Sequence, residues 1–127
     1  MFNYKLTLQY DGTRYAGWQI QENALSVQEV LRSSLRQILQ EDVNLIGAGR
    51  TDAGVHALGQ VANFTLDKKL DFFRFKYSTN SVLPDDISIT NIELVDEKFH
   101  SRFSAKKRSY IYLLSNQKSP FYDRYSY

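Results

Sequence analysis

The sequence contains no cysteine and only two prolines, one tryptophan and two histidines among its 127 residues. Without cysteine, the chain has neither a disulfide bond nor a thiolate that binds a metal or acts as a nucleophile, which suits a reducing compartment. It has no run of about 18 apolar residues of the kind that spans a membrane, and residues 1–5 lack the apolar core of a signal peptide. These absences predict a cytoplasmic protein with no membrane segment.

The composition is typical of one soluble domain. Of the 127 residues, 43% are hydrophobic and 24% are charged, so the chain is large enough to bury a core of its own. The formal net charge of +2 is too small to indicate a nucleic-acid partner by itself. We therefore expect a single domain spanning residues 1–127.

One local cluster is more basic than the chain as a whole. It contains four cations with aromatic residues among and after them: Arg102, Lys106, Lys107 and Arg108, with Phe103 and Tyr110. Such cations contact phosphates, and such rings stack on bases. A solvated, basic entry to a strand explains the same pattern equally well. The cluster alone leaves both interpretations open.

Hydrophobic periodicity predicts the first part of the fold. Residues 4–10 alternate in polarity, as a half-buried strand does. Residues 26–29 have the form of a capping box, and apolar residues then recur at three- and four-residue spacing, which predicts a helix over residues 26–40. Strand-type residues at 43–46 and 61–66 flank a glycine-rich segment.

The second part of the predicted fold, residues 70–113, again combines a helix with strands. Residues 70–80 contain Phe72, Phe73, Phe75 and Tyr77, which predicts a second helix buried on a broad face, with Asp71 in its first turn. Leu83-Pro84 ends it, and residues 87–95 and 110–113 have strand character. The order β-α-β-β-α-β predicts a ferredoxin-like α+β fold with the helices on one face of the sheet.

The most informative stretch is the glycine-rich segment of residues 47–57, Gly-Ala-Gly-Arg-Thr-Asp-Ala-Gly-Val-His-Ala. Three glycines permit a tight loop from which Arg50, Asp52 and His56 can project. A nucleotide-phosphate loop is disfavoured because neither the third glycine nor a following Gly-Lys-Ser/Thr is present. A metal site is disfavoured because a glycine-rich loop does not bring Asp52 and His56 together as a helix would. A purely structural Asx turn at Asp52 stays open on this stretch alone.

The same stretch closely resembles the catalytic loop of the tRNA pseudouridine synthase A (TruA) family, Gly-Arg-Thr-Asp-Ala-Gly-Val-His-Ala. Other segments resemble motifs of that family in order and spacing: Tyr10–Gly12 with Gly17–Gln19, Asn80 with Leu83–Ile87, Phe99–Ala105, and Arg108–Tyr112. A departure is Ile20, where many members have an arginine between two glutamines. Members are about twice as long, so the chain resembles the N-terminal half of such an enzyme.

The resemblance implies an isomerase that converts uridine to pseudouridine in the anticodon arm of tRNA (tRNA positions 38, 39 and 40), with no cofactor and no metal. It assigns the nucleophile to Asp52, with attack at C6 or at C1′ left open. Arg50, two residues away, is expected to be the partner of that carboxylate or of a phosphate. The resemblance also assigns Tyr110 to stacking on the flipped base. From the basic cluster, Arg102, Lys106 and Arg108 are expected to contact phosphates of the tRNA. His56 is expected to pack the loop.

The resemblance also implies a homodimer for the full-length protein, and a second half that completes the active-site cleft. A chain without that half is expected to be inactive. Two other classes share parts of the pattern. A non-catalytic RRM-like RNA-binding module has the same β-α-β-β-α-β order, although its aromatic signature is not visible here. A glycosidase-like pair needs a second carboxylate about 5–10 Å from Asp52.

Overall fold

The computed structural model describes residues 1–101 of the chain. The elements follow in this order: β1 (Phe2–Tyr10), the short 3-10 helix η1 (Gly12–Arg14), α1 (Val27–Leu39), β2 (Ile46–Gly47), β3 (Ala57–Leu66), α2 (Phe72–Val82) and β4 (Ile87–Val95). The predicted order β-α-β-β-α-β is confirmed. The strand predicted at residues 110–113 lies outside the described residues.

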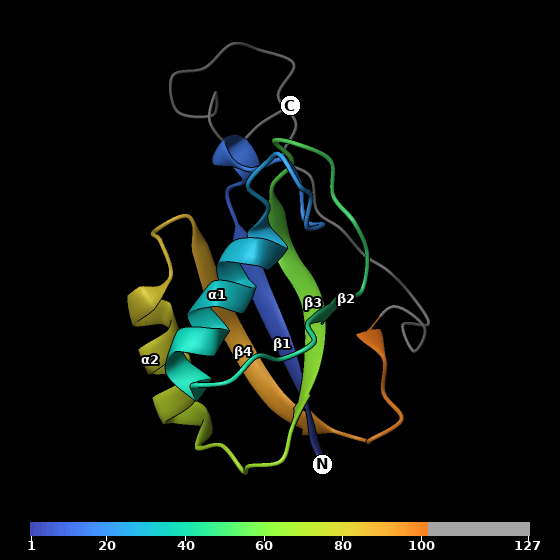
Figure 1. Cartoon of the computed structure of the whole chain (residues 1–127), viewed down its shortest axis with the longest axis vertical. Helices are drawn as coiled ribbons and strands as arrows, with labels where there is room; N and C mark the ends of the chain where they lie inside the picture. Colours follow the sequence, from blue (N-terminus) through green and yellow to red (C-terminus); the bar gives the residue numbers. More distant parts are fainter. Residues whose placement is uncertain (102–127) are drawn as a thin grey trace.

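The four strands form one antiparallel sheet with the order β2-β3-β1-β4. β1 is central, and its Tyr4 lies opposite Phe64 of β3 and Leu94 of β4. Each helix therefore connects two strands that are separated by a third, and both helices cover the same face of the sheet (Figure 1). This is the ferredoxin-like α+β fold that the sequence predicts.

The core lies between the helices and the sheet. Alternate residues of β1 point toward it, as the two-residue period of a strand requires: Tyr4, Leu6, Leu8 and Tyr10 are all buried. α1 contributes Val27, Leu31 and Leu35 to the same cluster, each fully buried leucine being worth about 1.5–3 kcal/mol. At the start of α1, the Ser26 Oγ accepts a hydrogen bond from the Glu29 N–H at 3.2 Å, which confirms the predicted cap.

α2 differs from the prediction. Asp71 is its N-cap, and its carboxylate accepts a hydrogen bond from the Arg74 N–H at 3.1 Å. Of the aromatic residues, only Phe75 is buried, at 4% exposure, whereas Phe73 and Tyr77 are 82% and 73% exposed. The prediction of burial on a broad face is wrong, because α2 meets a single sheet face and helical rotation turns Phe73 and Tyr77 away from it.

The edge of the sheet at β2 also differs from the prediction. The predicted strand at residues 43–46 is reduced to β2, which is two residues long, while β3 begins at Ala57 and is longer than predicted. Val43 and Leu45 are buried, but the Leu45 carbonyl accepts a hydrogen bond from the Gln28 side chain at 2.9 Å instead of pairing with a strand. Their apolar character reflects packing beside α1, not strand pairing.

The second sheet face carries mainly polar residues, and we call it the polar face. β3 contributes Val61, Asn63 and Thr65 to this face, and β1 contributes Asn3, Lys5 and Thr7. β4 contributes Asn91, Glu93 and Val95. Residues 96–101 pass over part of it. The Asn3 side-chain amide donates to the carbonyls of Asp96 (3.0 Å) and Phe99 (2.8 Å), and the Ser101 N–H donates to Asn63 Oδ1 at 2.7 Å.

The difference between Phe75 and Phe73 can be tested directly. Phe75→Ala is expected to lower the free energy of unfolding by about 3–5 kcal/mol, because it leaves a cavity against Phe64. Phe73→Ala, two residues earlier on the same helix, is expected to change it by about 0.5 kcal/mol or less. Urea titration of the two variants measures both values. Equal losses would contradict the orientation of α2.

Candidate active site

Three connections meet at one end of the sheet, the upper end in Figure 1. Because β3 and β4 both run antiparallel to β1, the last residue of β1, Tyr10, lies opposite Ala57 and Ile87, which begin those strands. The β1–α1 connection (residues 11–26), the β2–β3 loop (residues 48–56) and the α2–β4 connection (residues 83–86) therefore lie together. Four of the sequence segments that resemble family motifs are thus brought to one place.

The β2–β3 loop presents Arg50 and Asp52 to solvent. Both are exposed, whereas Thr51 between them is 7% exposed. The hydroxyls of Thr51 and Tyr10 share a buried hydrogen bond of 2.7 Å, and the Thr51 carbonyl accepts from the Trp18 N–H at 3.2 Å. Thr51 is thus anchored on the inside of the loop, and its two neighbours are directed outward.

The rest of the loop is held by its backbone. The Gln60 side chain donates to the Gly49 carbonyl at 2.9 Å. The Ala48 N–H donates to the Val61 carbonyl at 2.8 Å, and the Gly54 N–H donates to the Tyr15 carbonyl at 3.0 Å. Hydrogen bonds on both sides of Arg50 and Asp52 therefore fix the loop to β3 and to the β1–α1 connection.

Two glycines allow this close packing. A Cβ at Gly12 would lie 2.0 Å from the Val55 carbonyl oxygen, and one at Gly17 would lie 2.2 Å from the Thr51 carbonyl oxygen. Gly17 also has a φ of 82°, a left-handed conformation that favours glycine. The glycines of the Tyr-Asp-Gly and Gly-Trp-Gln stretches are therefore places where one backbone touches another.

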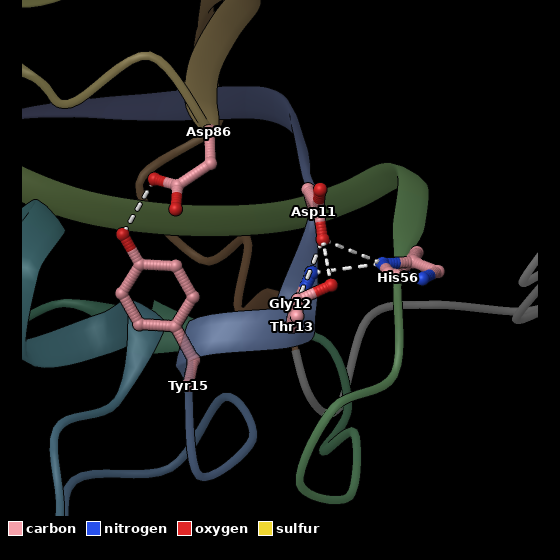
Figure 2. A network of polar contacts seen from close by, with 6 residues as sticks. All are labelled: Asp11, Gly12, Thr13, Tyr15, His56 and Asp86. Carbon is pink, nitrogen blue, oxygen red and sulfur yellow. Dashed lines mark hydrogen bonds and ion pairs between the residues drawn. The ribbon is translucent and has the colours of Figure 1, made fainter. Parts of the chain in front are cut away.

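His56 lies inside the loop, at 4% exposure (Figure 2). Its Nδ1 accepts a hydrogen bond from the Gly12 N–H at 2.9 Å and lies 3.2 Å from the Asp11 carboxylate. Nδ1 of His56 thus faces both the backbone and the carboxylate of the β1–α1 connection. The prediction that His56 packs the loop is confirmed.

A second polar contact joins the α2–β4 connection to the same region (Figure 2). The Tyr15 hydroxyl donates to the Asp86 carboxylate at 2.6 Å, and the Asp11 N–H donates to the Asp86 carbonyl at 2.9 Å. Burial, followed by the hydrogen bond to Asp86, raises the pKa of Tyr15 well above its ordinary value. The phenol thus stays protonated and remains a donor.

A hollow of about 500 Å³ lies beside the loop, within the usual size range of ligand pockets. Residues from four segments contribute to its lining, among them Trp18, Gln19, Asn44, Gly49, Arg50 and His100. Trp18 is 1% exposed, so it supports the wall by packing and does not offer a free ring face. The guanidinium of Arg50 and the amides of Gln19 and Asn44 suit contacts with phosphate or with base edges.

Of the predicted site residues, only Arg50 and Asp52 lie within the described part of the chain. Arg50 and Asp52 are both exposed on the loop, and within residues 1–101 no ion pair joins them. The predicted tRNA-binding residues lie outside the described part of the chain: Arg102, Lys106, Arg108 and Tyr110. Sequence reasoning missed the supporting roles of Tyr10, Thr51 and Gln60. The sequence signal at Tyr10 and Gln60 is a polar group among the apolar residues of a strand, and Thr51 has no such signal.

No group of three or more His, Cys, Asp or Glu side chains among residues 1–101 is arranged to hold a metal ion. In the same part of the chain, neither helix has the length and apolar character needed to cross a membrane.

A family model described as tRNA pseudouridine synthase matches residues 7–104. The chain therefore belongs to the tRNA pseudouridine synthase family. Individual relatives are similar to most of its length. The tRNA pseudouridine synthase A of Ruminiclostridium cellulolyticum is 54% identical over 112 residues, which are 88% of this chain and 46% of the relative.

Two further relatives match this chain over a similar share of their own length. The tRNA pseudouridine synthase A of Caldicellulosiruptor saccharolyticus is 51% identical over 93% of this chain and 48% of its own length. The tRNA pseudouridine synthase A 2 of Bacillus cereus is 46% identical over 99% of this chain and 53% of its own length. The chain thus spans about half the length of the relatives that it matches.

The close approach at Gly12 predicts a large effect of one added methyl group. Gly12→Ala is expected to lower the free energy of unfolding by more than about 2 kcal/mol, because the Val55 carbonyl would have to move. Gly59→Ala is the control, since a Cβ there meets nothing within 4 Å and is expected to cost nothing or to stabilise by up to about 1 kcal/mol. Urea titration measures both. Tolerance of alanine at Gly12 would contradict the packing of the two loops.

Proposed function

We propose that the protein to which this chain belongs converts uridine to pseudouridine in the anticodon arm of tRNA. The observation that carries the proposal is the anchored loop with two exposed polar side chains, Arg50 and Asp52, in a member of the tRNA pseudouridine synthase family. The relatives' name supports tRNA as the substrate. The cytoplasm, where tRNA is modified, is the proposed location, and a homodimer is the proposed form of the full-length protein.

The reaction breaks the N1–C1′ bond of a uridine, turns the base and joins C5 to C1′. The proton of C5 is released to solvent, and N1 takes up a proton in its place. No group is added and no electron is lost, so the reaction requires neither a redox cofactor nor a second substrate. In this proposal the Asp52 carboxylate is the nucleophile, attacking either C6 of the ring or C1′ of the sugar. Its exposure makes it accessible to a base that has been extruded from the RNA stack.

Arg50 has a separate role in the proposal. Since it lines the hollow and makes no ion pair with Asp52 within residues 1–101, we assign it to a phosphate of the RNA beside the target nucleotide. Stacking on the flipped base is assigned to Tyr110, and further phosphate contacts to Arg102, Lys106 and Arg108. These contacts hold the uridine in register with the carboxylate.

An RRM-like binding module is the second candidate, and the sheet does not favour it. An RRM stacks bases on aromatic side chains of its central strands. On the polar face, the central strands β1 and β3 present Asn3, Lys5 and Thr7, and Val61, Asn63 and Thr65, with no aromatic residue among them. The aromatic residues of β1 and β3, such as Tyr4 and Phe64, pack on the side of the helices.

Asp52→Asn tests the nucleophile in a protein of full family length that contains this chain. We expect no detectable tritium release from C5-labelled uridine in tRNA, because an amide cannot attack as a carboxylate does. The affinity for tRNA should be nearly unchanged, because phosphate contacts set affinity. Asp67→Asn is the matched control, since Asp67 is also exposed but lies after β3, at the opposite end of the sheet. Turnover by Asp52→Asn at the rate of this control would contradict the assignment of Asp52 as the nucleophile.

The chain of 127 residues alone is expected to form no pseudouridine. In the described part of the chain Asp52 is exposed, and in water a carboxylate interacts only weakly with developing charge. The other half of the relatives' length is proposed to close the cleft around it. The same tritium assay on this chain, with the full-length protein beside it, measures the difference. Comparable turnover by both would contradict a site that is shared between the halves.

A further inference from the structure

Tyr10 belongs to the Tyr-Asp-Gly stretch, which the proposed chemistry does not use. It is the last residue of β1 and is 4% exposed. Its ring stacks on that of Trp18, with centroids 6.4 Å apart and an interplanar angle of 23°. Its hydroxyl reaches across 41 residues of sequence to the Thr51 hydroxyl, at 2.7 Å. The hydroxyl of a buried tyrosine is thus hydrogen-bonded to a residue of the candidate-site loop.

Thr51 is the inner support of the loop. Its carbonyl is held by the Trp18 N–H and lies against Gly17, and its hydroxyl is held by Tyr10. The carbonyl contacts fix where the backbone lies. The hydroxyl contact limits how far the segment can rotate about its own backbone. This rotation determines where the next side chain, Asp52, points.

Direction matters for an exposed nucleophile. Glycines lie on both sides of Arg50 and Asp52, at positions 49 and 54, and glycine permits a wide range of backbone angles. A catalytic group that is displaced by about 1 Å can lose about 100-fold in rate. The loop therefore needs a side-chain contact that limits its rotation, and the bond between Tyr10 and Thr51 provides one.

We propose that Tyr10 is a positioning residue. Through its hydrogen bond to Thr51 it sets the direction of the Asp52 carboxylate, and so it contributes to turnover without contacting the RNA. The inference rests on the function proposed above. It gives the Tyr-Asp-Gly stretch a role in catalysis in addition to its part in the sheet.

Tyr4 provides a matched control for a purely structural role. It lies on the same face of the same strand and is 1% exposed. Its hydroxyl also makes tertiary hydrogen bonds, which are partly buried: it donates to the Lys68 carbonyl and accepts from the Leu70 N–H, both at 2.9 Å. These partners lie at the opposite end of the sheet from the loop. Tyr4→Phe therefore removes a hydrogen-bonded tyrosine hydroxyl of the same strand without affecting Thr51.

The experiment compares Tyr10→Phe and Tyr4→Phe in a protein of full family length that contains this chain. Tritium release from tRNA gives kcat and KM, and urea titration gives the midpoint of unfolding. Both variants should lower the midpoint to a similar extent. We expect only Tyr10→Phe to lower kcat, by about 10- to 100-fold, with KM and tRNA affinity unchanged, as for an interaction that acts in the transition state.

Variants of Thr51 test the other end of the bond. Thr51→Ser keeps the hydroxyl and should keep most of the kcat, whereas Thr51→Val keeps the shape and should lose as much as Tyr10→Phe. In the double variant Tyr10→Phe/Thr51→Val the two losses should not add, because both remove the same interaction. If Tyr10→Phe does not fold, the comparison of Thr51→Val with Thr51→Ser decides the question.

Equal kcat values for Tyr10→Phe and Tyr4→Phe would overturn the inference, as would equal values for Thr51→Val and Thr51→Ser. Losses that add in the double variant would do the same. Each of these outcomes leaves the proposed function intact. Failure of the unsubstituted protein to release tritium would instead refute the proposed function, and this inference with it.

Discussion

The contact between two backbones at Thr51 is the constraint on which the candidate site depends. The Thr51 carbonyl can approach Gly17 and accept from the Trp18 N–H only because residue 17 has no side chain. That approach brings the β1–α1 connection against the β2–β3 loop and buries Thr51. The exposure of Arg50 and Asp52 follows, since a buried residue between them turns both side chains toward solvent.

The sheet order makes this contact possible. With β1 in the centre, the connections that follow β1, precede β3 and precede β4 all lie at one end. Residues far apart in the sequence then share hydrogen bonds, as Tyr15 and Asp86 do across 71 positions. The other end of the sheet carries no residue of the candidate loop. One end of the fold thus holds the proposed chemistry, and the rest of the domain supports it.

Local patterns in the sequence were enough to predict much of this fold. The cap at Ser26, the spacing in α1 and the alternation in β1 are set by neighbours in the chain, and these predictions are confirmed. The exposure of Phe73 was not predictable in this way, because aromatic content does not reveal which side of a helix meets the sheet. Likewise, the 2.7 Å contact between Tyr10 and Thr51 joins residues 41 positions apart and depends on strand register.

The cover over the polar face has a different character from the core. Residues 96–101 are held there through the amides of Asn3 and Asn63, and by Phe99, whose ring centroid lies 5.8 Å from the Lys5 ammonium. When such a cover lifts, water can replace the lost hydrogen bonds, so opening costs less than exposing an apolar surface of equal size. Residues 96–101 are therefore expected to open at a lower cost than the core, as a unit of lower local stability.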